Sequence, residues 1–242
     1  MDKVILTPRL ELILQQSIDI ESDEVKDYHL LRCDPGATSW SFGGVAKDIQ
    51  ESQQVLIKNH FPIKDHDNDV RQYRASYNVY LRGDTTTKAP QGRDSSRFIG
   101  RVGALEGRVY GPPFSPDLVI PDDILANEKA LKLEVGYSFL EKSWGHGYAS
   151  EALKALMAAY QNANSLWNPP YEKVYFMGIL GPANVRSSRV LEKVGFRLKG
   201  IHSWDGPKHF LGGAMQPNEV AVYSLDPSLG KREESQAGDE RV

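Results

Sequence analysis

The most informative segment of the chain reads Trp144-Gly145-His146-Gly147-Tyr148-Ala149-Ser150-Glu151-Ala152. Two glycines separated by one residue let the backbone curl so that successive N–H groups converge. A helix that begins at Tyr148 adds its own unpaired N–H groups and the positive end of its dipole. The segment therefore predicts an anion site suited to a pyrophosphate, and Lys142 is near enough in sequence to add positive charge.

The pattern of this turn has three other interpretations besides the anion site. A tight strand-to-helix connection that binds no ligand has the same pattern. The dinucleotide-binding motif needs a further glycine where this chain has Ser150. The phosphate loop of nucleoside triphosphatases needs the pattern G-x-x-x-x-G-K-[ST], which the sequence lacks. The two nucleotide motifs are therefore excluded, and a ligand-free turn is the alternative that stays open.

The segment before the turn has the pattern of a half-buried strand. Its apolar face comprises Leu131, Leu133, Val135, Tyr137 and Phe139. Its other face comprises Lys132, Glu134, Gly136 and Ser138. Alternation of this kind places every second side chain on the same side of a strand.

The segment after the turn predicts a helix, a strand and a second helix. Apolar residues with helical spacing indicate a helix over residues 148–162. Residues 173–180 are nearly all apolar, which is typical of a central strand covered on both faces. Asn184 can cap a short helix over residues 185–194, and Gly195 can end it.

The rest of the chain fits a single mixed α/β domain over residues 1–226. Further strands are expected over residues 10–14, 73–81, 98–105, 197–204 and 220–225, and further helices over 22–32 and 46–59. Long loops are expected at 82–96, 107–130 and 205–219. The charged tail at 227–242 is expected to be disordered.

Composition restricts the function classes. The 242 residues carry 29 Lys and Arg against 32 Asp and Glu, and this balance argues against a nucleic-acid partner. A lone cysteine, Cys33, fits a reducing compartment. The start of the chain lacks the form of a signal peptide, and no apolar stretch is long enough to span a membrane. We therefore expect a cytoplasmic protein without a membrane partner.

Several motifs in order resemble the GNAT (GCN5-related N-acetyltransferase) superfamily, and within it the RimJ/RimL-like branch. They are the glycine turn quoted above, Asn184-Val185-Arg186-Ser187-Ser188-Arg189-Val190-Leu191-Glu192-Lys193-Val194-Gly195-Phe196, Leu6-Thr7-Pro8-Arg9-Leu10-Glu11-Leu12, Glu134-Val135-Gly136-Tyr137 and Val222-Tyr223-Ser224-Leu225. The resemblance covers residues 4–226. It implies a mixed, mostly antiparallel sheet flanked by helices, in which two central parallel strands splay apart and hold acetyl-CoA.

The resemblance also implies which residues bind the cofactor. The expected set is Phe139, Leu140, Lys142, Trp144, Gly145, His146, Gly147, Tyr148, Ala149, Asn184 and Ser187. Within it, the backbone of Phe139 would pair with the pantetheine arm, and the N–H groups near Phe139 and Leu140 would polarise the thioester. Lys142 stands where many members of the superfamily have Gln or Arg.

Two residues are the catalytic candidates. Glu134 is the expected general base, although it could equally be an exposed or paired carboxylate, and a water chain could replace it. Ser187 lies in the first turn of its helix and could protonate the departing thiolate, or it could only help to cap the helix. Many members of the superfamily place a Tyr acid where this chain has Leu191, so the Tyr mechanism is not available from this helix.

The predicted reaction is acetyl transfer from acetyl-CoA to a primary amine, which could be a small amine or a protein N-terminus. The alternative is a CoA-binding module without transferase activity. Trp40, Phe42 and Trp204 could line the acceptor site or simply cover the core. No metal is expected, because the histidines have no metal-ligand spacing. The sequence leaves open the identity of the acceptor and the formation of a homodimer. It also leaves open the roles of the long loops and of the tail.

Overall fold

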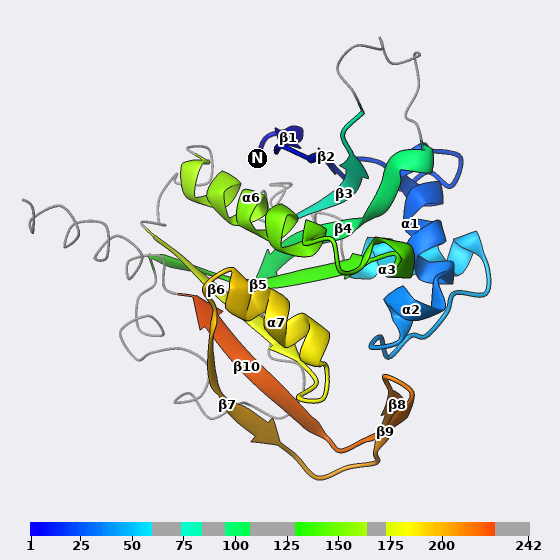
Figure 1. Cartoon of the computed structure of the whole chain (residues 1–242). Helices are drawn as coiled ribbons and strands as arrows, with labels where there is room; N and C mark the ends of the chain where they lie inside the picture. The colour runs from blue at the N-terminus through cyan, green and yellow to red at the C-terminus, as the bar shows by residue number, and fades with distance from the viewer. Residues whose placement is uncertain (60–73, 84–94, 107–128, 164–172, 226–242) are drawn as a thin grey trace, which may run out of the picture.

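A computed structural model describes residues 1–59, 74–83, 95–106, 129–163 and 173–225. These residues form one eight-stranded sheet flanked by helices (Figure 1). Across the sheet the strands are β1 (Val4–Leu6), β2 (Leu10–Leu14), β3 (Ala75–Leu81), β4 (Phe98–Glu106), β5 (Ala130–Phe139), β6 (Lys173–Leu180), β10 (Glu219–Leu225) and β7 (Arg197–Ser203). Every neighbouring pair is antiparallel except β5 and β6, which are parallel. The expected mixed, mostly antiparallel sheet is therefore confirmed.

The parallel pair β5 and β6 forks partway along its length. The two strands pair only from Ala130 opposite Lys173 to Glu134 opposite Met177. Beyond Glu134, β5 continues to Phe139 paired with β4, while β6 continues to Leu180 paired with β10. The expected splay of the two central strands is present, and Glu134 is the last β5 residue before the strands separate.

Helices cover both faces of the sheet. The helices α6 (Tyr148–Asn162) and α7 (Val185–Lys193) pack on one face, and α1 (Asp23–Cys33), α2 (Pro35–Thr38) and α3 (Ile49–Asn59) lie together beside the other (Figure 1). Short 3₁₀ turns, η1 (Ser95–Arg97) and η2 (Glu141–Ser143), lead into β4 and out of β5. The strands β8 (His209–Leu211) and β9 (Ala214–Gln216) form a separate small hairpin.

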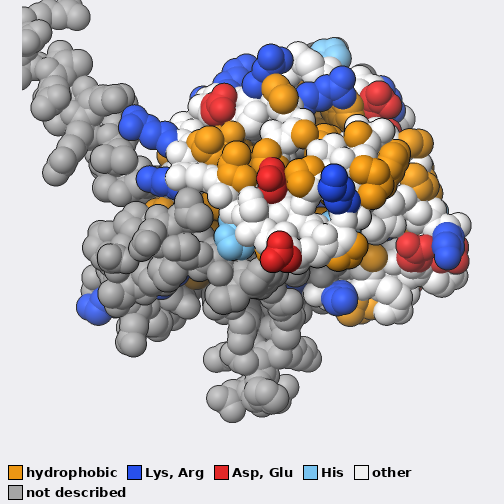
Figure 2. Space-filling view, turned by 90° about the horizontal axis from the view of Figure 1, so that it is seen from below, with side chains coloured by type: hydrophobic (Ala, Val, Ile, Leu, Met, Phe, Trp, Pro, Cys, Tyr) orange, Lys and Arg blue, Asp and Glu red, His pale blue; other side chains and the backbone are white. Residues whose placement is uncertain are grey.

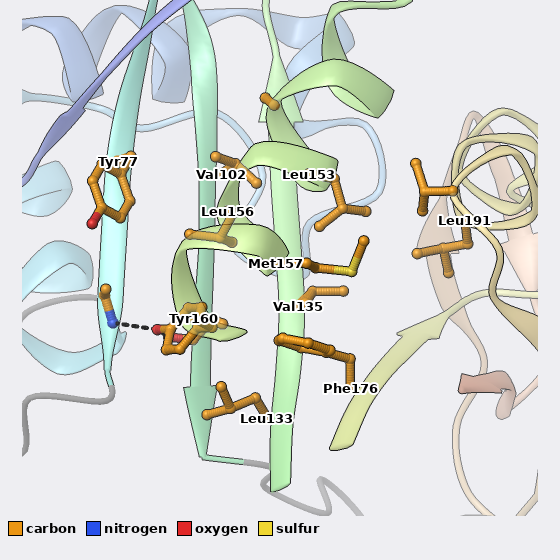
Figure 3. Packing of buried hydrophobic residues seen from close by; sticks show 14 of the residues in the cluster. Tyr77, Val102, Leu133, Val135, Leu153, Leu156, Met157, Tyr160, Phe176 and Leu191 are labelled. Atoms are coloured by element: carbon orange, nitrogen blue, oxygen red, sulfur yellow. Dashed lines mark hydrogen bonds between the residues drawn. The ribbon is translucent and has the colours of Figure 1, made fainter. Parts of the chain in front are cut away.

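The main core lies between the sheet and α6. Leu153, Leu156 and Tyr160 of α6 are fully buried against β5 and β6 (Figure 3). The hydroxyl of Tyr160 accepts a hydrogen bond of 3.1 Å from the backbone N–H of Ala75, at the start of β3. This contact fixes the C-terminal end of α6 relative to the strand.

One expectation about the local structure needs correction. The loop expected at 205–219 contains the β8–β9 hairpin, because the Gly212-Gly213 pair with positive φ supplies a tight turn. The helix expected over 22–32 is α1, and Asp34, which follows it, also begins the short helix α2, since its side chain accepts a hydrogen bond of 2.8 Å from the N–H of Ala37. The strand β3 is buried on both faces, because α1 packs on its second face.

Parts of the expected loops, 84–94 and 107–128, lie outside the described residues, as does the tail at 227–242. In the described part of the chain, no helix is both long and apolar enough to cross a membrane. The side of the molecule seen from below, where Figure 1 places β7 and the hairpin, carries hydrophobic side chains scattered among charged ones (Figure 2).

Candidate active site

A cavity of about 970 Å³ lies where β5 and β6 separate. The fork opens this cavity because the facing edges of the two strands are no longer joined by a ladder. Ten of the predicted site residues line it: Trp40, Glu134, Phe139, Trp144, Gly145, Gly147, Tyr148, Ala149, Asn184 and Ser187. Five do not: Phe42, Leu140, Lys142, His146 and Trp204. The fold thus brings most of the predicted cofactor residues and both catalytic candidates to one space.

The glycine turn presents open N–H groups to the cavity. Gly145 and Gly147 adopt φ values of 80° and 79°, a conformation that favours glycine. Gly147 caps α6 without any side-chain hydrogen bond, so the first N–H groups of the helix have no side-chain cap. A Cβ built on Gly147 would lie 3.6 Å from the guanidinium of Arg9 and 3.8 Å from Nζ of Lys193. The turn combines open N–H groups, a helix dipole and two cations, as a pyrophosphate site requires.

Arg9 is held at this turn by Glu151, in the first turn of α6. The ion pair between Arg9 Nη2 and Glu151 Oε2 is 2.6 Å long, and Arg9 Nη1 donates to the carbonyl of His146 at 3.0 Å. Burial alone would raise the pKa of Glu151, but hydrogen bonds from Thr7 and Arg9 outweigh burial and lower that pKa. The N-terminal segment therefore braces the glycine turn with a charged pair.

The cations beside the turn differ from the one expected. Lys142 is exposed and outside the cavity lining, while Arg186, Arg189 and Lys193 of α7 line it. The guanidinium of Arg186 lies 4.6 Å from the ring centroid of Trp144. Sequence reasoning missed these cations, although Arg9, Arg186 and Lys193 all lie inside the motifs that carry the family resemblance.

The edge of β5 that faces the fork carries free backbone groups. The N–H of Leu140 donates to the carbonyl of Ile99 at 2.9 Å, so the expectation that it polarises the thioester is wrong. Because antiparallel ladders alternate, the backbone groups of Val135, Tyr137 and Phe139 point away from β4 and toward the fork. The carbonyl of Phe139 is already used, since it accepts 2.8 Å from the indole of Trp144. The N–H groups along this edge are the available donors.

The start of α7 forms the opposite wall. The side-chain oxygen of Asn184 accepts a hydrogen bond of 3.2 Å from the N–H of Ser187, which confirms the predicted cap. The hydroxyl of Tyr137 crosses the fork and donates to the carbonyl of Ser187 at 2.9 Å. Leu191, where many superfamily members have a Tyr, is buried and packs against Gly178. Hydrogen bonds with Asn184, which follows β6, and with Tyr137 of β5 therefore hold the helix turn that carries Ser187.

Glu134 occupies the vertex of the fork. Its Oε2 atom is buried and has no hydrogen-bond partner in the described part of the chain, and burial raises the pKa of its carboxyl group to about 7. Among the described residues that line the cavity, it is the only carboxylate. A carboxyl group that is half ionised near neutral pH can accept a proton there.

The three aromatic residues expected at the acceptor site lie in different places in the structure. Trp40 lines the cavity and packs against Gly212 at the tip of the β8–β9 hairpin. Phe42 is 73% exposed and meets the ring of His209 edge-on. Trp204 stacks on His202. The expectation that Phe42 and Trp204 line the acceptor site thus receives no support from the shape of the cavity.

Buried polar residues that sequence reasoning missed lie on the same side as Trp40. They are Tyr28, Arg32 and Arg101, from α1 and β4. No single sequence motif predicts these residues as part of the site, because they come from separate elements and only the fold brings them together. In the described part of the chain, no group of His, Cys, Asp and Glu has the arrangement of a metal site.

Comparison with known proteins agrees with this geometry. Residues 18–197 match the sequence model of the Acetyltransferase (GNAT) domain. A Bacillus subtilis relative, the uncharacterized protein YkkB, is 31% identical over 90 residues. That match covers 37% of this chain and 46% of the relative, so it spans about half the length of YkkB.

Solved structures share the fold at low identity. A GNAT-family acetyltransferase from Bacillus anthracis has a TM-score of 0.53 and 17% identity, over 92% of this chain and 97% of that one. RimL, a ribosomal alpha-N-protein acetyltransferase solved with coenzyme A, has a TM-score of 0.57 and 18% identity over the same shares. A spermidine N-acetyltransferase from Vibrio cholerae, solved with CoA and spermine, has a TM-score of 0.54 and 14% identity, over 90% and 96% of the two chains.

Proposed function

Because the chain belongs to the GNAT acetyltransferase family, we propose that it is an acetyl-CoA-dependent N-acetyltransferase that acts on a primary amine. The observation that carries the proposal is Glu134 at the vertex of the fork, whose Oε2 atom is buried without a partner among the described residues and whose pKa burial raises to about 7. Burying a carboxyl group without a partner costs free energy, and such groups cluster at functional sites. Its environment suits a base that works near neutral pH.

The donor end of the cavity fits acetyl-CoA, which supplies the activated acetyl group when bound. The N–H groups of Gly147 and the first turn of α6 would hold the pyrophosphate, with Arg9 and Lys193 beside them. The free edge of β5 would pair with the pantetheine arm through the N–H and carbonyl groups that point into the fork. Asn184 fixes the turn of α7 that faces this edge.

The chemistry balances with residues of the site. The acceptor must lose a proton to become a neutral amine, and Glu134 accepts that proton directly or through a water chain. The amine nitrogen then bonds to the acetyl carbon as the carbon–sulfur bond breaks. N–H groups of the β5 edge stabilise the negative charge that develops on the carbonyl oxygen. The departing thiolate takes a proton from the hydroxyl of Ser187 or from water, and the second proton that the amine nitrogen loses as the amide forms replaces it.

The test is release of CoA thiol from acetyl-CoA by the purified full-length chain with a panel of primary amines. We expect amine-dependent release, together with a raised melting temperature in acetyl-CoA. Thermal stabilisation without release for any amine would contradict transfer and favour a CoA-binding module. Absence of stabilisation would contradict both.

We also propose that the enzyme works in the cytoplasm without nucleic-acid or membrane partners. The near balance of charges and the lone Cys33 support this placement. Fractionation of the cell that makes the protein, followed by immunoblotting, would test it.

A further inference from the structure

Two arginines are buried on the acceptor side of the cavity. Arg32, near the end of α1, is 6% exposed, and Arg101, in β4, is 4% exposed. Both line the cavity, and neither belongs to the glycine turn or to α7. They therefore form a cationic region separate from the proposed pyrophosphate site.

The protein itself leaves much of the hydrogen-bonding capacity of both guanidinium groups unused. In each arginine, Nε and Nη2 are buried and have no hydrogen-bond partner among the residues that the structure describes. The remaining contacts are long, because Arg101 Nη1 lies 3.4 Å from the side-chain oxygen of Gln15 and Arg32 Nη1 lies 3.5 Å from the hydroxyl of Ser41. Buried donors of charged groups that find no acceptor cost free energy. Such an arrangement is expected where an external acceptor completes the bonds.

Two carboxylates lie near the pair. Glu51 Oε1 lies 3.9 Å from Arg32 Nη2, a long ion pair. Glu24 acts electrostatically on Arg101, while its Oε2 atom accepts from the backbone N–H groups of Gln16 and Ser17. Burial lowers the pKa of Arg101 to about 10, so its guanidinium is still charged at neutral pH.

The guanidinium groups of Arg32 and Arg101 both lie near the ring of Tyr28. The guanidinium of Arg101 lies 4.7 Å from the ring centroid of Tyr28. Burial raises the pKa of Tyr28, and the charges of Arg101 and Arg32 partly offset that rise. Arg32 follows Tyr28 by about one turn of α1, and all three residues line the cavity, so both charges lie near one phenol, where a planar anion can meet two forked donors.

An open strip of backbone connects this region to Glu134. In the ladder of β4 and β5, Arg101 lies opposite Ser138, Gly103 opposite Gly136, and Leu105 opposite Glu134. Arg101 and Glu134 thus share a face of the sheet, about 13 Å apart along the strands. A Cβ built on Gly136 would meet nothing within 4 Å. Gly136 therefore leaves room for a ligand between the cations and the carboxyl group, while Gly103 allows close packing of β4 against Ser76 of β3.

We propose that the acceptor is a small amine that also carries a carboxylate or phosphate, with its anionic group held by Arg32 and Arg101 and its amine facing Glu134. The inference rests on the proposed N-acetyltransferase function. It disfavours polycations as acceptors, because a second ammonium group would meet the buried guanidinium charges.

Matched acceptors test the inference in the wild-type protein. CoA release is measured with L-amino acids against the corresponding amino-acid amides, with phosphoethanolamine against ethanolamine, and with spermidine. We expect kcat/KM to be at least about 10-fold higher for the anionic member of a pair. Because loss of the carboxylate lowers the pKa of the amine and makes the amide more reactive, such a preference must come from binding. The two pairs distinguish a carboxylate from a phosphate.

Variants locate the preference. Arg32→Gln and Arg101→Gln should each raise KM for the anionic acceptor about 10- to 100-fold and leave KM for acetyl-CoA unchanged. Arg82→Gln is the matched control, because Arg82 is exposed and outside the cavity lining. If circular dichroism shows that Arg101→Gln does not fold, the inference is tested by Arg32→Gln and by the matched acceptors in the wild-type protein.

The outcomes separate the two proposals. Transfer to amides, ethanolamine or spermidine that equals or exceeds transfer to the anionic amines would overturn the inference while the N-acetyltransferase function stands. An anionic preference that both variants leave unchanged would also overturn it. If no amine in the panel causes release of CoA thiol, the result would contradict the proposed function itself.

Discussion

The two ends of the cavity are built in opposite ways. At the donor end, backbone N–H groups of one contiguous turn do the binding, and the cations beside it, Arg9 and Lys193, are on or near the surface. At the acceptor end, side chains from separate elements are buried, and their charges, on Arg32, Arg101 and Glu134, lack full partners. The donor end thus suits a ligand shared by a whole family. The acceptor end suits a ligand particular to this chain, because separate side chains can change independently of the backbone.

The largest expected effect is at the acceptor end, at Glu134. Glu134→Gln keeps the shape of the side chain but removes the base, so kcat should fall about 100- to 1,000-fold. KM for acetyl-CoA should stay the same, since Glu134 is not part of the pyrophosphate site. Steady-state kinetics with a saturating amine measure both constants. A loss confined to KM for acetyl-CoA would place Glu134 in the donor end instead.

The next largest effect should break the donor end alone. Gly147→Glu places a bulky, negatively charged side chain at a position with φ of 79°, beside the proposed pyrophosphate site. Like charges in contact cost several kcal/mol, so the Kd for acetyl-CoA should rise about 100-fold or more. Titration calorimetry with CoA measures it. Gly213→Glu is the matched control, because Gly213 has φ of 85° but lies in the turn of the β8–β9 hairpin. Equal losses in both variants would mean that backbone strain, not the site, causes the effect.

The smallest expected effect concerns the wall between the two ends. Ser187→Ala removes the hydroxyl proposed to protonate the thiolate, so kcat should fall about 10-fold with little change in cofactor affinity. Ser188→Ala is the control, since its hydroxyl donates to Val185 within α7 and lies outside the cavity lining. Unchanged turnover in Ser187→Ala would assign the proton to water.

Sequence reasoning worked best where structure is local. The bounds predicted for α6 and β6, residues 148–162 and 173–180, agree with the structure, because each element carries a strong periodicity or a continuous apolar run. The cap at Asn184 was also predictable, since capping depends on neighbours in the chain. The splay of β5 and β6 came from the family resemblance, and pairing registers confirm it.

What sequence reasoning missed depends on contacts between distant segments. The burial of Arg32 and Arg101 follows from α1 packing on the sheet, and no spacing in the sequence announces it. The N–H of Leu140 was misassigned because its partner, Ile99, is on a strand far away in the sequence. The β8–β9 hairpin is not predictable from the sequence, because its strands are very short.

The central claim is that Glu134 is the base of the reaction, and the pH dependence of kcat/KM for the amine tests it most directly. Burial raises the pKa of Glu134 to about 7, so the group is protonated and inactive as a base below that pH and ionised above it. The wild-type profile should therefore rise through an apparent pKa near 7. In Glu134→Gln this limb should vanish, leaving only the rise at higher pH from ionisation of the amine itself. A limb with the same midpoint in both proteins would contradict the account.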